Sequence, residues 1–343
     1  MHRYMNWALA LSFVLTGNGV NSSVRTERAA SARASSSVDE LVALLPAMDM
    51  VAVIDMPRAM RELLPRLKTI DVGGISRLAK DIEEFTRMAG IDATKISSAV
   101  AGLTIDGLSA KGGALVIEGV DIDPKRIETA VTASHWQFQK IDQKGSSLYR
   151  LSRVKQSEAG TENAQEKSEE VYFALLGPQR AVAGDLATVK DVAGAQAARN
   201  AETNATLRTA LKETRSSGLI RFALSLPEGL RQMLDGQGDL FQQLAAVKVI
   251  LGALDMAGDQ SAQFDARLRT NSKEDAAQLA TNLKSLVTLG RSFLGGDQNA
   301  KSQIIGQLLD QVQIAPQAGD VSLSLLVPKA LLDQWAKPEQ LKN

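Results

Sequence analysis

A near-repeat of one twelve-residue segment constrains the fold of this chain more than any other feature. The segment VIDMPRAMRELL, residues 53–64, returns as ALSLPEGLRQML, residues 223–234, at one offset and without a gap. An apolar run leads into each copy. Each copy then carries a proline where a helix takes its first residue, a position at which the missing N–H costs little. Each copy therefore predicts a strand, a sharp turn and an amphipathic helix.

The segments that follow the two copies keep the same order of predicted elements. In both halves a strand with a central glycine, Gly102 or Gly252, turns into a second strand, as in an antiparallel hairpin. A helix with its own start signal comes next. The signal is Asp123 before a proline in one half, and Ser272 with Asp275 as a capping box in the other. Both halves close with a hairpin and a helix.

This order predicts an α+β fold made from a duplicated β-α-β-β-α-β-β-α unit, with a mainly antiparallel sheet and helices packed on one face. We expect the first repeat over residues 38–200 and the second over residues 201–340, because the apolar pattern lapses over residues 198–206. The first repeat contains an additional strand pair and a polar tract, residues 155–170. The polar composition of that tract predicts a hairpin tip with few apolar side chains to bury.

Several apolar stripes at helical spacing predict further helices. One stripe runs over residues 75–88, and another comprises Ile304, Ile305, Leu308, Leu309 and Val312. A third, after the second hairpin, comprises Leu279, Leu283, Leu286 and Val287. We interpret the first two stripes as faces that pack on the core, with a membrane face or a partner face as the alternative.

The N-terminus has the three regions of a secretory signal. Arg3 precedes an apolar run over residues 7–15, and polar residues follow. The run is shorter than the roughly 20 residues that span a bilayer. Small residues three apart allow cleavage after Ser22 or after Ala32, and we assign residues 1–32 to the signal peptide and leader. The sequence thus predicts a bacterial periplasmic or secreted protein.

Composition excludes several kinds of chemistry. The chain has no cysteine, which removes disulfides, thiolate nucleophiles, Cys-based zinc sites and lipidation on cysteine. Its 39 basic and 39 acidic residues balance, and removal of the leader takes away only three arginines and one glutamate. No large net charge draws the chain to nucleic acid or to an anionic membrane. We expect no nucleic-acid partner and no membrane span after signal removal.

Motifs for nucleophilic and phosphate chemistry are weak or missing. His135 is the single histidine outside the leader, so paired-histidine metal sites lose their ligands. Ser152 and Lys155 match S-x-x-K, but they lie in an alternating, strand-like segment that points them to opposite faces, whereas that chemistry needs a helix. The chain contains no P-loop, dinucleotide-binding or G-x-S-x-G motif.

Carboxylates are the remaining candidates for acid–base chemistry or for calcium. Asp121 and Asp123 flank a strand end, and Asp235 and Asp239 lie in a glycine-rich loop. None has the EF-hand spacing, and all occupy positions where Asp commonly caps helices or forms turns. We interpret them as turn and cap residues, with calcium binding and catalysis as alternatives.

Aromatic residues are scarce, at 4% of the chain. A stacking cleft for sugars or bases would have to combine residues that are spread along the sequence. These residues are Trp136, Tyr149, Tyr172, Phe173 and Trp335. The distribution argues against carbohydrate or single-strand binding.

Two segments resemble a known family. The sequence LVALLPAMDMVAVIDMPRAM, residues 41–60, and the sequence RAVAGDLATVKDV, residues 180–192, resemble uncharacterised exported bacterial proteins of the DUF3352 type, which open on LLPAD…V…VD. The likeness covers the first half, and Met48 stands where that family has an acidic or small residue. The resemblance implies an exported protein and assigns no site residues.

These observations favour a non-enzymatic envelope protein over an enzyme. The hypothesis is a binding or interaction protein with a groove between two homologous halves, which takes an envelope protein or an apolar small ligand and needs no cofactor or metal. One alternative is a carboxylate-dependent hydrolase with a dispersed active site. Another is a structural or assembly protein, which would expose an apolar patch larger than a few hundred Å².

Overall fold

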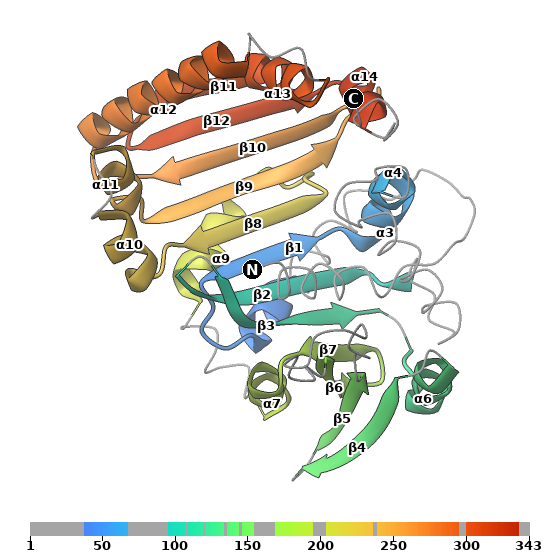
Figure 1. Ribbon diagram of the computed structural model, residues 1–343. Coiled ribbons are helices and arrows are strands. Elements are labelled where there is room, and N and C mark those ends of the chain that lie inside the picture. The colour runs from blue at the N-terminus through green and yellow to red at the C-terminus, as the bar shows by residue number, and fades with distance from the viewer. Residues whose placement is uncertain are drawn as a thin grey trace, which may run out of the picture. The chain divides into compact units, whose positions relative to one another are not determined.

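The structure is a computed structural model. It describes residues 38–67, 95–107, 109–119, 121–133, 136–143, 146–153, 169–194, 204–235, 239–294 and 300–335. The fold is mixed α/β, with a large antiparallel sheet and helices (Figure 1). The chain forms two compact units: unit 1 takes residues 1–48, 80–104 and 110–204, and unit 2 takes residues 49–79, 105–109 and 205–343. Several predicted features lie outside the described residues: the signal peptide, the stripe over residues 75–88 and most of the polar tract.

Unit 1 is built on six strands in antiparallel order. Their order is β2 (Ser98–Asp106), β3 (Ser109–Glu118), β7 (Arg180–Gly184), β6 (Glu169–Gly177), β5 (Ser146–Arg153) and β4 (Gln137–Gln143). Its helices are α6 (Pro124–Ala133) and α7 (Leu186–Gly194), and residues 38–44 are also helical. The middle of β3, residues 114–117, is buried at four successive positions, so both faces of this strand are covered.

A buried amide joins the two ends of unit 1. The side chain of Asn204 is 2% exposed. Its Nδ2 donates to the carbonyl oxygens of Leu45, at 3.0 Å, and Pro46, at 2.8 Å. Its Oδ1 accepts from the backbone N–H of Met48 at 3.2 Å. Asn204 thus satisfies three backbone groups of a segment more than 150 residues earlier in the chain.

Unit 2 is also built on six antiparallel strands. Their order is β11 (Val312–Gln317), β12 (Asp320–Val327), β10 (Ala262–Arg269), β9 (Val249–Met256), β8 (Ile220–Ser225) and β1 (Met50–Ile54). β1 pairs with β8 in a register that runs from Met50 opposite Leu224 to Ile54 opposite Ile220. Residues 49–79, which the repeat pattern assigns to the first half, therefore belong to unit 2.

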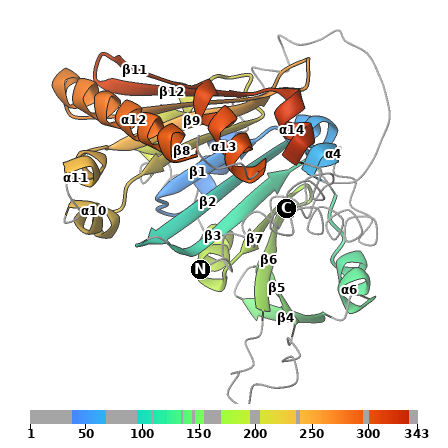
Figure 2. The same cartoon turned by 45° about the horizontal axis from the view of Figure 1, so that its top comes forward.

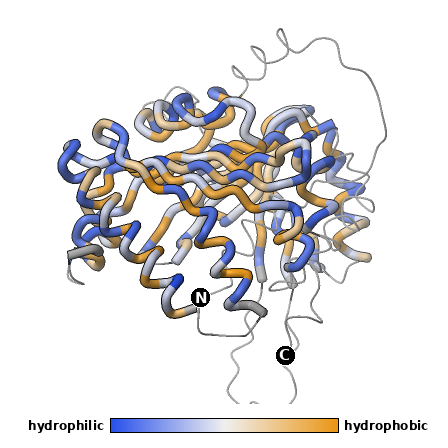
Figure 3. The backbone as a smooth tube through the Cα atoms, turned by 90° about the horizontal axis from the view of Figure 1, so that it is seen from above, coloured by the Kyte–Doolittle hydropathy of each residue, from blue (hydrophilic) through white to orange (hydrophobic). Residues whose placement is uncertain are grey.

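One face of the unit 2 sheet packs on a group of helices. These are α10 (Glu228–Asp235), α11 (Asp239–Ala245), α12 (Lys273–Leu294) and α13 (Ala300–Gln311). Leu268 of β10 and Val321 of β12 form a buried cluster with Ala276, Leu279 and Ala280 of α12. Figure 2 shows α12 and α13 on the same side of these strands, and in Figure 3 the strands carry much of the hydrophobic colour. This cluster is the core of the helical side of unit 2.

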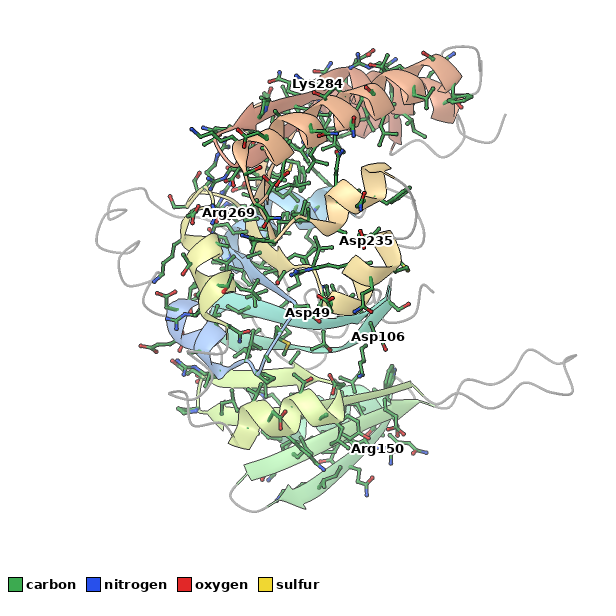
Figure 4. The ribbon with its side chains drawn as sticks, turned by 90° about the vertical axis from the view of Figure 1, so that its left-hand side faces the viewer. Asp49, Asp106, Arg150, Asp235, Arg269 and Lys284 are labelled. Atoms are coloured by element: carbon green, nitrogen blue, oxygen red, sulfur yellow. The ribbon has the colours of Figure 1, made fainter. Side chains whose placement is uncertain are left out.

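The other face of the same sheet carries a further helix, α9 (Ala205–Lys212). Ala223 and Leu251 point to this face and are 0% and 1% exposed. Arg269 also points there, and it donates to Glu213, which directly follows α9 (Figure 4). The prediction of helices on one face is therefore wrong for unit 2, because apolar residues fill both faces of its central strands and each face needs a cover.

Several local predictions are confirmed. Asp55 caps the helix α3 (Met56–Arg58) by accepting from the N–H of Arg58 at 3.0 Å, and proline lies in the first turn. Ser272 accepts from the N–H of Asp275 at 3.0 Å at the start of α12. Gly252 lies at the centre of β9, as predicted. The structure adds that it lies under Phe222: a Cβ at Gly252 would come within 2.7 Å of that ring.

Three short segments follow β1. α3 continues as a π-helix, η1 (Ala59–Leu63), and then as α4 (Leu64–Leu67). The N–H of Leu64 donates to the carbonyl of Ala59, five residues earlier, which defines the wider turn. At the other end of the chain, α14 (Lys329–Trp335) follows β12. Within the described ranges, no helix is long and apolar enough to cross a membrane.

Candidate functional site

The C-terminal half of α12 carries an exposed row of large apolar side chains. Leu286, Leu289 and Phe293 are 44%, 52% and 76% exposed. Their spacing of three and four places them on one stripe of the helix. We call these three residues the α12 ridge. Among the residues that the structure describes, Phe293 is the most exposed large hydrophobic side chain.

The ridge exists because α12 is apolar over more than one face. Ala276, Leu279 and Ala280 fill the core, and Leu283 packs against them. The ridge lies beside this buried face rather than on it, since its residues follow a separate stripe. Helical spacing groups Leu286 with Leu279 in the sequence, and in the structure Leu279 is buried whereas Leu286 is exposed.

The solvent side of the ridge is bordered by hydroxyls that bond to their own helix. Each hydroxyl donates to the carbonyl four residues earlier, at 2.9 to 3.1 Å. The residues are Thr281, Ser285, Thr288 and Ser292. These bonds occupy the hydroxyl protons, so the border is uncharged and its oxygens remain available only as acceptors.

The charged residues of α12 near the ridge lie elsewhere on the helix. Lys284 and Arg291 share a different stripe, and Lys284 is labelled on α12 in Figure 4. Arg291 forms an ion pair with Asp310 of α13 at 3.0 Å and donates to the carbonyl of Leu309 at 2.6 Å. On α13, Ile305 is 43% exposed. α13 therefore also carries an exposed apolar side chain, and the two cations of this part of α12 point to α13 or to solvent.

Unit 2 also contains an open pocket of ≈ 580 Å³. Three parts of the unit line it: the helical turns after β1, the β9–β10 turn and α14. The lining residues that matter for its chemistry are Arg58, Arg61, Glu62, Arg66, Gln260 and Asp333, and Pro65, Met256, Ala257 and Leu332 supply apolar surface. We call this the arginine pocket. Nothing in the sequence patterns pointed to it, because its residues are brought together by the long-range pairing of β1 with β8.

Arg58, which lines the arginine pocket, is held by several hydrogen bonds. Its Nε and one terminal nitrogen donate to the two carboxylate oxygens of Glu62, at 3.0 and 2.7 Å. It also donates to Asp255 at 2.7 Å and to the carbonyl of Ser217. The pKa of Arg58 is raised above its ordinary value, chiefly by the hydrogen bond to Glu62, with Asp255 adding to the effect. Arg58 is thus a permanently charged structural residue.

A network of ion pairs covers the α9 face of the unit 2 sheet. Arg269 donates to Glu213 at 2.6 Å and to Asp320 at 3.2 Å, and Arg267 lies within ion-pair distance of the same two acids. The hydrogen bond from Arg269 lowers the pKa of Glu213. The two arginines and the two acids balance each other on this face, and Glu213 is an ionised acceptor rather than a proton donor.

The carboxylates and the serine singled out from sequence are scattered. Asp123 caps α6, where its carboxylate accepts from the N–H of Lys125 at 2.9 Å. Asp121 is exposed beside it, and Asp235 is exposed at the end of α10. Ser152 is buried on β5, 3.5 Å from an amide oxygen of Gln137. His135, Lys155 and the side chain of Asp239 lie outside the described residues.

The aromatic residues of unit 1 belong to its core. Tyr149 and Phe173 stack with ring centroids 4.6 Å apart, and both are buried. Phe138 completes the cluster at 5.3 Å from Tyr149. Tyr172 is also buried and donates to Glu170 at 2.6 Å. Trp136 is half-buried, and the side chain of Trp335 is not described.

Comparisons with known proteins add little to this geometry. The chain matches no protein-family model, and a search of curated proteins gives no match. Among solved structures it is similar to TP0453 in crystal form I, with a TM-score of 0.38 and 9% sequence identity over 87% of this chain and 96% of that chain. Among the residues that the structure describes, no group of three or more His, Cys, Asp or Glu side chains could hold a metal ion.

Proposed function

We propose that this chain is an exported, non-enzymatic interaction protein that docks an amphipathic helix of a protein partner on the α12 ridge. The observation that carries the proposal is the exposure of Leu286, Leu289 and Phe293 on one stripe of a helix whose other apolar face is already buried. A large exposed apolar patch on a folded unit is typical of an interaction surface.

The spacing of the ridge supports a helical partner. Leu286, Leu289 and Phe293 follow the i, i+3, i+7 pattern of the a and d positions of a heptad. One turn earlier, Asn282 continues the same pattern, but its amide donates to Gln243 of α11 at 2.9 Å. The exposed part of this heptad pattern therefore begins after Asn282, and it gives a partner helix about two turns of α12 to pack against.

Burial of the exposed apolar surface of the ridge would contribute several kcal/mol to the free energy of binding. Complete burial of a Leu or Phe side chain contributes about 1.5–3 kcal/mol. The exposed fractions of the ridge side chains run from 44% for Leu286 to 76% for Phe293, so docking would contribute roughly 3–5 kcal/mol from these three residues by the same scale. This is about a 150-fold to 5,000-fold effect on a dissociation constant.

The border of the ridge favours a protein over a lipid bilayer. Helices that bind bilayer surfaces carry Lys and Arg along the polar face, next to the apolar one. Here the border consists of hydroxyl groups, and Arg291 is held by Asp310. A neutral border suits the flank of a partner helix.

We further infer that the chain arose by duplication of one α+β unit. The order of elements supports this: β1, a helical segment, β2, β3 and α6 precede the closing hairpin β6–β7 and α7, and β8, α10, β9, β10 and α12 precede β11–β12 and α14. The two central glycines support it too. A Cβ at Gly102 would meet Leu45, and one at Gly252 would meet Phe222. The signal-like N-terminus supports export.

Site-directed photo-crosslinking tests the proposed function. A photo-reactive residue at position 293 is expected to crosslink to one protein in the envelope of the source cells, at the apolar face of a helix. The crosslink should be lost in Leu289→Glu and kept in Thr281→Glu, which adds the same charge to the hydroxyl border of the same helix. Crosslinking to phospholipid alone, or equal crosslinking in both variants, would contradict the proposal.

A further inference from the structure

We infer that the arginine pocket binds a small organic anion, with its carboxylate held by Arg61 and a short apolar body against the wall formed by Pro65, Met256 and Leu332. This site is separate from the α12 ridge and does not depend on the function proposed for that surface. Its volume, ≈ 580 Å³, lies in the range that holds small ligands.

The acids of the arginine pocket already have cationic partners. Both carboxylate oxygens of Glu62 accept from Arg58. Asp255, just outside the lining, accepts from Arg58 and also lies 3.8 Å from Arg215. Asp333 accepts from the ammonium group of Lys329 at 2.5 Å. The repulsion between these carboxylates and an incoming anion is therefore reduced.

Arg61 is the cation best placed to bind an incoming anion. Its side chain is 67% exposed, and its contact with Glu62 is long, at 3.4 Å. The Glu62 oxygen that it approaches already accepts a shorter hydrogen bond from Arg58. The guanidinium group of Arg61 can thus turn its planar fork to a carboxylate without breaking a strong ion pair.

The remaining polar wall is held in position by an unusual turn. Arg66 donates to the side-chain oxygen of Gln260 at 2.6 Å. Gln260 adopts a positive φ of 69°, which side-chain-bearing residues seldom do, and its N–H donates to the carbonyl of Ala257 at 2.8 Å. The π-helix η1 carries Arg61 and Glu62, which also line the pocket. Irregular backbone in two of the segments that line one pocket is a feature of binding sites.

The apolar half of the wall decides what kind of anion fits. Pro65, Met256, Ala257 and Leu332 line the pocket together with the arginines. Inorganic anions would use the guanidinium groups alone, whereas a carboxylate with a chain of several carbons would also cover this apolar wall. We therefore assign the pocket to aliphatic or aromatic monocarboxylates of small size.

Calorimetric titration with octanoate tests this inference, with octanol as the neutral ligand of equal length. Wild-type protein should bind octanoate saturably and more tightly than octanol, and added salt should weaken the binding. Arg61→Gln should weaken octanoate binding about tenfold to 100-fold, the range for loss of a charge-assisted hydrogen bond. Arg61→Lys should fall between the two, because it keeps the charge and loses the fork.

Arg126→Gln provides a matched control. Arg126 is also an arginine with a 67% exposed side chain beside an acid, but it lies on α6 of unit 1. Its replacement should leave octanoate binding as in wild type, and circular dichroism should show that Arg61→Gln remains folded. Absence of saturable binding in wild type, equal affinity for octanol, or equal loss in Arg126→Gln would each overturn the inference.

Discussion

Replacing Asn204 with alanine should strongly destabilise unit 1. The amide makes three hydrogen bonds at 2.8 to 3.2 Å to Leu45, Pro46 and Met48, and its side chain is 2% exposed. Alanine would leave two carbonyl oxygens and one N–H without partners. An unsatisfied buried group costs about 1–3 kcal/mol. Because the Pro46 carbonyl is less deeply buried than the others and water can reach it, we expect a total of about 3–5 kcal/mol.

Urea unfolding followed by circular dichroism measures this loss. Thr206→Ala, an exposed change two residues later, should alter the free energy of unfolding by less than about 0.5 kcal/mol. Asn204→Asp removes the two N–H donors of the amide, so a carboxylate oxygen would face the carbonyl oxygens of Leu45 and Pro46. Its folded pKa would be raised, so its destabilisation should lessen as the pH falls through that pKa. A cost for Asn204→Ala below about 1 kcal/mol, with unchanged slope in urea, would refute the reasoning.

Two further predictions concern unit 2. Gly252→Ala places a Cβ 2.4 Å from the carbonyl oxygen of Asp265 and should cost about 1–3 kcal/mol in urea unfolding, whereas Gly258→Ala, with open space around it, should be nearly neutral. Glu213→Gln removes a carboxylate whose pKa is lowered by Arg269. Its stabilisation, about 0.5–1 kcal/mol for a partly exposed pair, should be present at neutral pH and vanish as the pH falls through the folded pKa of Glu213, so melting temperatures of wild type and variant should converge in acid.

Local signals in the sequence predicted the order of elements well. Proline after β1 fits a helix start because it has no N–H to satisfy, and Ser272 caps α12 through a bond to a residue three positions on. A short stretch of sequence therefore contains the information that these helix starts need. The partner of β1 was not predictable in the same way. Its alternation of apolar residues specifies a strand, but many strands could pair with it, and β8 is some 170 residues away along the chain.

The candidate sites were harder to predict, for two physical reasons. Helical spacing identified the apolar residues of α12, but it does not tell which of two adjacent stripes is buried, and Leu289 and Phe293 lie on the exposed one. The apolar residues of α12 cover a wider arc of the helix than one packed face needs. The width of that arc would have predicted an exposed apolar surface on α12. For the arginine pocket, Arg61 and Gln260 are separated by about two hundred residues, and no local pattern connects them.

The pairing of β1 with β8 also affects how the chain can be made and cut. Unit 2 contains residues 49–79 and 105–109 as well as residues 205–343, and two segments of unit 1, residues 80–104 and 110–204, lie between these along the chain. No single cleavage can therefore release either unit whole, and a fragment that starts at residue 205 would lack one strand of the unit 2 sheet and leave β8 unpaired along one side. During synthesis β1 must wait until β8 has emerged. This protein should accordingly fold late and cooperatively, and depend on being kept unfolded until its full length is available.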